Sequence, residues 1–135
     1  MGGSARLKLL LDTHIWLWSL HEPGKLGKRV LHELKDSQNE NWLSPISTWE
    51  ALTLNAKGRI QLPADLAEWV RRATSPLREA PLTHEIALLA RQLVLPHNDP
   101  ADHFLAAAAQ LLKLTLVTAD ANLLGLGNIS TLANR

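Results

Sequence analysis

Short apolar runs, each followed closely by an acidic residue, are the feature that most limits how this chain can fold. Residues 7–11 are almost continuously apolar and stop at Asp12, and residues 114–117 form a β-rich run that ends shortly before Asp120. A run of this length without polar alternation is typical of a strand buried on both faces, as in parallel sheets covered by helices. The rest of the chain must then supply those helices.

Stretches with helical spacing lie between these expected strands. Apolar periodicity, proline starts and glycine ends predict helices at residues 15–20, 30–34, 46–56, 63–73, 83–95 and 100–112. Further short strands are expected at residues 42–43, 79–82 and 129–132. Parallel neighbours need crossover connections of this kind. We therefore expect an α/β protein, a three-layer α/β/α sandwich with a central parallel sheet of four to five strands.

Length and composition fit one domain, which we expect to span residues 6–135. The chain has 135 residues, 46% of them hydrophobic, and no apolar run long enough to span a membrane. Residues 1–5 lack the features of a secretion signal, and we expect a flexible leader or a remnant of cloning there. The absence of cysteine excludes disulfides and thiolate chemistry, which makes the cytoplasm the expected compartment. The net charge is only +1, so any contact with nucleic acid must be local or assisted by a metal.

Four acidic residues are expected to meet at one edge of this sheet. Asp12 and Asp120 follow buried strands, and ligands of parallel sheets bind beyond the carboxyl ends of the strands. Asp102 lies at the third position of the last long helix and begins the apolar stripe that faces the sheet. Glu50 lies in the opening turn of the helix that follows the second strand. Four separate segments thus each supply one carboxylate.

Carboxylates gathered in this way predict a metal site. Like charges close together raise one another's pKa, and a divalent cation lets them stay ionised together. Hard oxygen ligands select Mg²⁺ or Mn²⁺, which bind phosphate oxygens and activate water in phosphate chemistry. Asp99, directly before Pro100, is first of all a helix cap and is a lesser candidate as a metal ligand.

Each acid also has a structural interpretation. Asp12 and Asp120 could be turn residues that bond to their own backbone. Asp102 would favour the helix dipole, and Glu50 could complete a capping box with Ser47. Local chemistry does not separate the two interpretations for any single acid, and only their joint placement favours a functional site.

The histidines are not expected to be metal ligands of the predicted site. His97 and His103 are six residues apart and would not share a helix face as metal ligands do, so packing or surface roles are expected. His14 follows Asp12 by two residues and could touch a substrate.

The five tryptophans could belong to the core, a dimer surface or a platform for base stacking. Helical spacing favours the core for Trp49 and Trp69. Trp16 and Trp18 are two residues apart and cannot face the same way. The stretch 15–20 is apolar over more of its circumference than one sheet contact can cover, so part of it should be left for a partner.

Taken together and in order, five segments resemble a PIN-domain nuclease, specifically a VapC-type toxin of a bacterial or archaeal toxin–antitoxin pair. The segments are residues 9–14, 47–50, 57–60, 97–102 and 116–120. The resemblance implies a Mg²⁺- or Mn²⁺-dependent endoribonuclease that cuts RNA, is held inactive by a small antitoxin and is commonly a homodimer. The family's four catalytic, metal-binding acids fall on Asp12, Glu50, Asp102 and Asp120. Relatives often carry Arg and Lys where this chain has His103 and Leu54, which leaves the choice of RNA target open.

Three other functions fit parts of the pattern. A phosphatase with Asp12 as nucleophile would need a second aspartate two positions on, where this chain has His14. A phospho-receiver domain would need an adjacent acidic pair near the first strand, which is missing. A PIN-like module that binds RNA or protein without cutting is the main alternative, and the intact acids argue against it.

Overall fold

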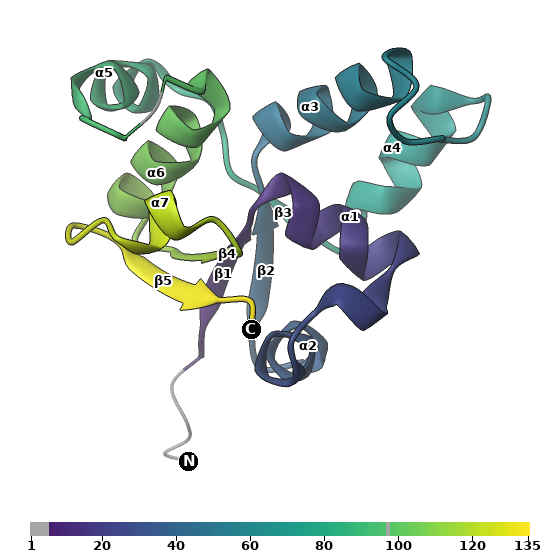
Figure 1. Cartoon of the computed structure of the whole chain (residues 1–135), viewed down its shortest axis with the longest axis horizontal. Helices are drawn as coiled ribbons and strands as arrows, with labels where there is room; N and C mark the ends of the chain where they lie inside the picture. Colours follow the sequence, from purple (N-terminus) through teal and green to yellow (C-terminus); the bar gives the residue numbers. More distant parts are fainter. Residues whose placement is uncertain (1–5, 97) are drawn as a thin grey trace.

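A parallel sheet of five strands forms the centre of the molecule (Figure 1). The structure is a computed structural model that describes residues 6–96 and 98–135. Its strands are β1 (Lys8–Leu11), β2 (Glu40–Leu43), β3 (Arg78–Glu79), β4 (Thr115–Thr118) and β5 (Ser130–Ala133). They lie in the order β3-β2-β1-β4-β5, and all neighbours pair in parallel. The predicted sheet is confirmed, whereas the leader expected at residues 1–5, like His97, lies outside the described residues.

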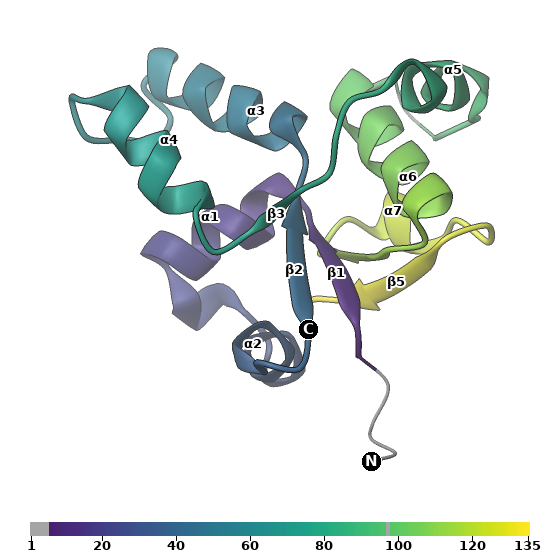
Figure 2. The same ribbon diagram turned by 180° about the vertical axis from the view of Figure 1, so that it is seen from behind.

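Helices cover both faces of this sheet and complete the predicted three layers. The helices are α1 (Thr13–His21), α2 (Lys28–Lys35), α3 (Pro45–Ala56), α4 (Leu66–Thr74), α5 (His84–Gln92), α6 (Pro100–Leu112) and α7 (Ala121–Leu124), with a 3₁₀ turn at Pro23–Lys25. Figures 1 and 2 show α1 to α4 on one side of the sheet and α5 to α7 on the other. Within the described residues, no helix combines the length and the apolar character needed to cross a membrane.

The apolar run in β1 fills both cores. Leu9 and Leu11 pack in the cluster under α1 to α4, and Leu10 packs in the cluster under α5 and α6. Successive side chains of a strand point to opposite faces, so an uninterrupted apolar run needs a core on each side. The alanines at 106–109 in α6 are all buried, which brings that helix close to the sheet.

Two helix boundaries differ by three residues from the predicted ones, and the other helix ends differ by two residues or fewer. α4 begins at Leu66 rather than at residue 63, because Asp65 is its N-cap and accepts a hydrogen bond from the third helical amide at 3.1 Å. α5 ends at Gln92 rather than at residue 95. Leu93 is already extended, and Pro96 further on disfavours helical backbone just before it.

Three short elements also differ. β2 begins at Glu40, two residues before the strand predicted at 42–43. The four-residue helix α7 was not predicted, because so short a segment carries no apolar periodicity. β3 covers Arg78–Glu79 and shares only its last residue with the strand predicted at 79–82. The predicted edge strand is present as β5.

One of the two tryptophans assigned to the core is buried. Trp69 is buried, and its ring lies 5.4 Å from that of Trp16. The prediction for Trp49 is wrong, because 62% of its surface is exposed. On α3 the buried positions are Ser47 and Ala51, and Trp49 lies two residues from each, on the opposite side of the helix.

Candidate active site

The candidate site lies where the strand order reverses. The chain adds β2 and β3 on one side of β1, then β4 and β5 on the other. The connections that leave the carboxyl ends of β1 and β4 therefore diverge, which leaves a crevice between them. Asp12 follows β1 and caps α1, accepting from the Thr13 amide at 2.8 Å. Asp120 follows β4 and caps α7, and its side chain accepts a hydrogen bond from the backbone amide of Asn122 at 2.9 Å. Both acids therefore have the structural role that the sequence suggested, at the edge where ligands bind.

The buried hydroxyl of Thr118 joins these two acids. It donates to Asp12 Oδ2 at 2.6 Å and accepts from the Asp120 amide at 3.0 Å. With the Thr13 amide on the other oxygen, Asp12 has a donor on each carboxylate oxygen. Its carboxylate plane is thus fixed before any ligand arrives.

Glu50 is held from across the site. The N-cap of α3 is Ser44, which accepts from the Ile46 amide at 3.1 Å, so the capping box proposed between Ser47 and Glu50 is wrong. Ser47 is instead buried, with its hydroxyl 2.9 Å from that of Thr13. The Thr13 hydroxyl hydrogen-bonds to Glu50. Thr13, the residue next to Asp12, therefore orients Glu50 on α3.

The remaining acids stand at the start of α6. Asp99 is the N-cap, accepting from the Ala101 amide at 3.1 Å, so its expected capping role is confirmed. Asp102 follows in the first turn and is only 8% exposed. It lies on the same side of α6 as the buried Leu105 and Ala106, which pack toward the sheet.

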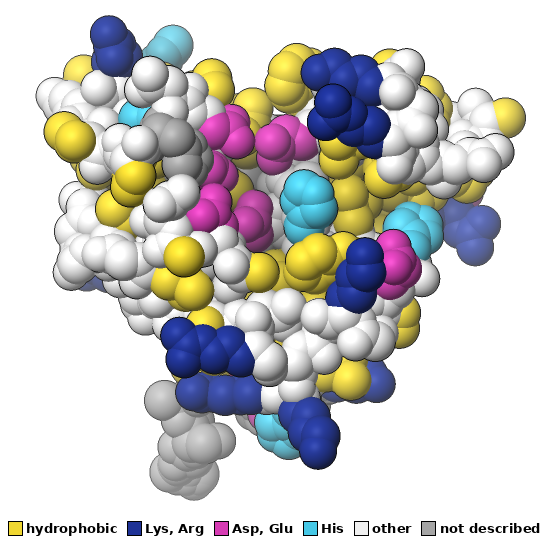
Figure 3. Space-filling model, viewed as in Figure 1, with side chains coloured by type: hydrophobic (Ala, Val, Ile, Leu, Met, Phe, Trp, Pro, Cys, Tyr) yellow, Lys and Arg dark blue, Asp and Glu magenta, His cyan; other side chains and the backbone are white. Residues whose placement is uncertain are grey.

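These acids share one hollow of about 350 Å³. Its lining is Asp12, His14, Ile15, Trp18, Glu50, Asp99, Asp102, Ala119 and Asp120. Figure 3 shows the acidic side chains gathered in this depression, with basic and hydrophobic side chains around its rim. The structure thus brings together all four predicted site residues and the lesser candidate Asp99.

The electrostatics of the hollow favour a cation. Burial raises the pKa of Asp12 above its ordinary value, against the opposing effect of the hydrogen bond from Thr118. Burial also raises the pKa of Glu50, and the nearby charges of Asp99 and Asp12 raise it further. The donors are carboxylate oxygens from several directions, which is the donor set that Mg²⁺ and Mn²⁺ accept. The residues present therefore fit a hard divalent cation.

Sequence reasoning missed the hydroxyls that hold the acids and gave little weight to two other residues of the hollow. Thr13 and Thr118 were not singled out, although each lies within two residues of a candidate acid, and Ser47 was assigned only to a capping box. His14 and Trp18 line the hollow. His103, which lies in α6 one residue after Asp102, points elsewhere, with Nδ1 3.0 Å from the Ala90 carbonyl oxygen.

Replacing Thr118 with valine should lower the stability of the protein by about 1–3 kcal/mol at neutral pH, because a buried carboxylate oxygen of Asp12 loses its donor. Valine keeps the shape of the side chain. Thr115→Val, on the same strand, is the matched control, because the Thr115 hydroxyl pairs with Ser130 at an exposed position. Thermal unfolding of both variants measures the difference. Equal melting temperatures for the two would contradict a holding role for Thr118.

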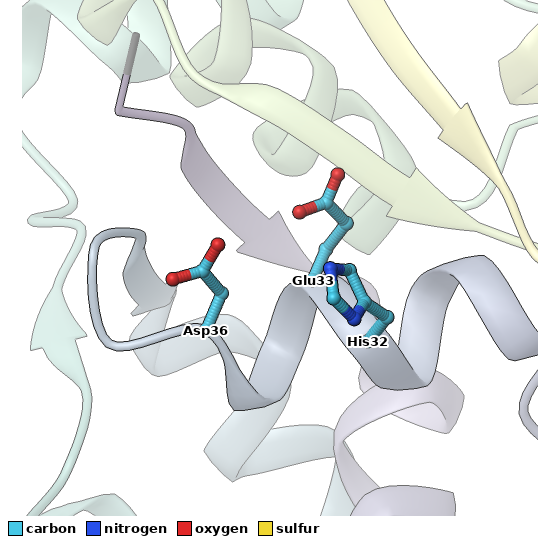
Figure 4. A group of neighbouring side chains, drawn as sticks. All are labelled: His32, Glu33 and Asp36. Carbon is cyan, nitrogen blue, oxygen red and sulfur yellow. The ribbon is translucent and has the colours of Figure 1, made fainter. Parts of the chain in front are cut away.

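A second group of possible metal ligands lies apart from the hollow. Figure 4 shows His32, Glu33 and Asp36 at the end of α2, with ligand atoms within 4.8 Å of one another. α2 leads into the start of β2, so this group is at the amino end of the strands, opposite the hollow. Glu33 already accepts from the Asn39 side-chain amide at 3.1 Å. We assign this group to the polar surface of α2.

Comparisons with known proteins agree with this geometry. Solved structures of the same fold include the VapBC2 complex from Rickettsia felis, with 16% identity over 96% of this chain and 100% of that chain and a TM-score of 0.72. The VapBC complex from Salmonella typhimurium has 16% identity over 94% of this chain and 98% of that chain, with a TM-score of 0.69. FitAcB from Neisseria gonorrhoeae has 18% identity over 91% of this chain and 95% of that chain, with a TM-score of 0.64.

Sequence comparison gives the family. No curated protein matches the chain in sequence. A family model does match: that of the PIN domain, over residues 9–128. The match runs from β1 past β4 and includes every acid of the hollow. The chain therefore belongs to the PIN domain family.

Proposed function

We propose that this protein is a metal-dependent endoribonuclease and the toxin of a toxin–antitoxin pair of the VapC type. One observation carries the proposal: carboxylates from four separate segments line a single open hollow at the strand ends. The proposed catalytic metal ligands are Asp12, Glu50, Asp102 and Asp120, with Asp99 as a lesser candidate. Membership of the PIN domain family supports a nuclease, and the proposed nuclease domain spans residues 6–135.

The proposed cofactor is Mg²⁺ or Mn²⁺. When bound, such an ion supplies charge that holds a phosphate oxygen of RNA and lowers the pKa of a water molecule. The chain's own part is to hold the donors in place. The Thr118 hydroxyl and the Thr13 amide fix Asp12, and the Thr13 hydroxyl fixes Glu50.

The proposed cutting of RNA at internal positions is tested with two substrates of one sequence, a circular RNA and a circular single-stranded DNA. An endoribonuclease should linearise the RNA in the presence of Mn²⁺ and leave the DNA intact. Circles have no ends, so an exonuclease would leave both intact. An RNA circle that is bound but never opened would instead support a PIN-like module that binds without cutting.

The proposed partners are a small antitoxin and a second copy of the chain, in the cytoplasm. The similar structures from Rickettsia felis and Salmonella typhimurium are VapBC complexes described as bound to DNA. An acidic hollow open to substrate is also open to an Arg or Lys side chain from an antitoxin, which would supply positive charge where the metal binds. Leu20, in the apolar stretch of α1, is 43% exposed and offers apolar surface to a partner.

Inhibition by the product of the neighbouring gene should weaken as salt rises, because charge attraction into the hollow is screened. We expect a homodimer by light scattering at micromolar concentration, and RNA cleavage that falls as the neighbouring product is titrated in. Inhibition should be relieved several-fold between 50 mM and 500 mM salt. A strict monomer with cleavage unaffected by that product would contradict the toxin assignment and leave the nuclease assignment standing.

A further inference from the structure

One wall of the acidic hollow is aromatic, and a lysine lies against its tryptophan. Trp18 and His14 both line the hollow, and their rings meet edge to face with centroids 5.8 Å apart. The Lys25 ammonium nitrogen lies 5.6 Å from the centroid of the Trp18 ring. Lys25 also forms an exposed salt bridge with Glu22 at 3.2 Å, which offsets part of its charge. The other residues around the hollow are mainly acidic.

Core packing of α1 accounts for this wall only in part. The helix buries Ile15, Trp16 and Leu17 to 5% exposure or less, and Trp18 packs only at the margin of the same core cluster. Trp18 is only partly buried, and His14 is exposed. A site that bound only a charged ligand would not need a tryptophan. Trp18 nevertheless presents a flat apolar surface next to the carboxylates. The wall therefore fits a ligand that combines an anionic group with a flat ring.

We propose that Trp18 stacks an unpaired nucleobase of the substrate, next to the phosphate that enters the acidic hollow, with His14 at the edge of that base. This proposal rests on the proposed action on RNA. An aromatic side chain stacks any base, because every base has a π-face, so the contact is expected to be tolerant of sequence. Lys25 lies over the Trp18 ring, so the base stacks on the other face of the indole, and the part of the Lys25 charge that Glu22 does not offset favours the adjoining phosphate.

The test measures binding of a 12-nucleotide single-stranded RNA in Ca²⁺, followed by cleavage in Mn²⁺. Trp18→Ala should weaken binding about tenfold to a hundredfold, and Trp18→Phe should retain most of it. Trp49→Ala is the matched control, because Trp49 is 62% exposed and lies outside the hollow. Its affinity for the RNA should be within about twofold of that of the unmodified chain.

Abasic substitutions separate stacking from a structural effect. A single abasic position, moved along the RNA, should weaken binding to the unmodified chain at one place and leave binding to Trp18→Ala unchanged there. Equal sensitivity of both proteins at every position would overturn the proposal, as would unchanged RNA binding by Trp18→Ala. If Trp18→Ala fails to fold, the same comparison is made with Trp18→Leu, which keeps an apolar side chain without a flat ring.

The same measurements distinguish this proposal from the proposed nuclease function. RNA that is bound with one abasic-sensitive position, but never cut, would contradict the nuclease and support the stacking contact. RNA that is cut, but has no abasic-sensitive position, would support the nuclease and contradict the stacking contact. A chain that neither binds nor cuts RNA would contradict both.

Discussion

Replacing Asp102 with asparagine is expected to lower the rate of RNA cleavage by more than about a hundredfold. Loss of a residue that only supports a metal ligand typically costs 10- to 100-fold, and loss of a ligand itself should cost at least as much. The side chain is 8% exposed, lines the hollow and changes by one atom, so the fold should survive. Initial cleavage rates at saturating Mn²⁺ measure the effect.

Glu85→Gln is the control for this substitution. Glu85 also lies in the first turn of a helix, α5, so its loss removes a similar interaction with the helix dipole. It is exposed and does not line the hollow. We expect Glu85→Gln to cleave RNA at a rate within about twofold of that of the unmodified chain. If Asp102→Asn cuts RNA as fast as Glu85→Gln, Asp102 does not belong to the catalytic site.

Divalent metal is expected to raise the melting temperature by about 10 °C when its concentration is 100 times its dissociation constant. Binding to the folded state alone then contributes about 2.7 kcal/mol. Asp12→Asn should remove most of this increase. Asparagine is an equally good helix N-cap, so the start of α1 is preserved. A melting curve unchanged by millimolar Mn²⁺ or Mg²⁺ would contradict a metal site formed by the folded chain.

The metal-free protein should respond to Asp12→Asn in the opposite direction. The pKa of Asp12 is raised from 3.8 and that of Glu50 from 4.5, so the folded state binds protons more tightly than the unfolded state does. Stability without metal should therefore fall as pH rises from about these ordinary values through the raised pKa values, and the loss is complete above them. Removing the Asp12 charge should thus raise the metal-free melting temperature at pH 7. A decrease would show that the charge of Asp12 stabilises the empty hollow.

The sequence was most informative where structure depends on neighbours along the chain. The buried run before Asp12 predicts β1, and the Asp99-Pro100 pair predicts the start of α6. The parallel topology follows from the alternation of strands and helices, and with it the edge at which Asp12, Asp102 and Asp120 stand.

Contacts between distant segments could not be predicted in the same way. The Thr118 hydroxyl meets a carboxylate 106 residues away, and the Thr13 hydroxyl meets Glu50 across 37 residues. No local pattern indicates which acid a hydroxyl will hold. The error at Trp49 has a related cause. Helix α3 carries apolar residues on several sides, and the buried side is the one with Ser47 and Ala51, where Ser47 meets Thr13 of α1.

The most direct test of the central claim is the reversible loss of RNA cleavage on removal of metal. The protein is treated with EDTA, assayed on an end-labelled RNA, dialysed to remove the EDTA and assayed again after addition of Mn²⁺ or Mg²⁺. Cleavage that disappears and returns in the unmodified chain, and never returns in Asp102→Asn, is the predicted result. Cleavage that continues undiminished in EDTA would contradict the carboxylate-bound metal centre.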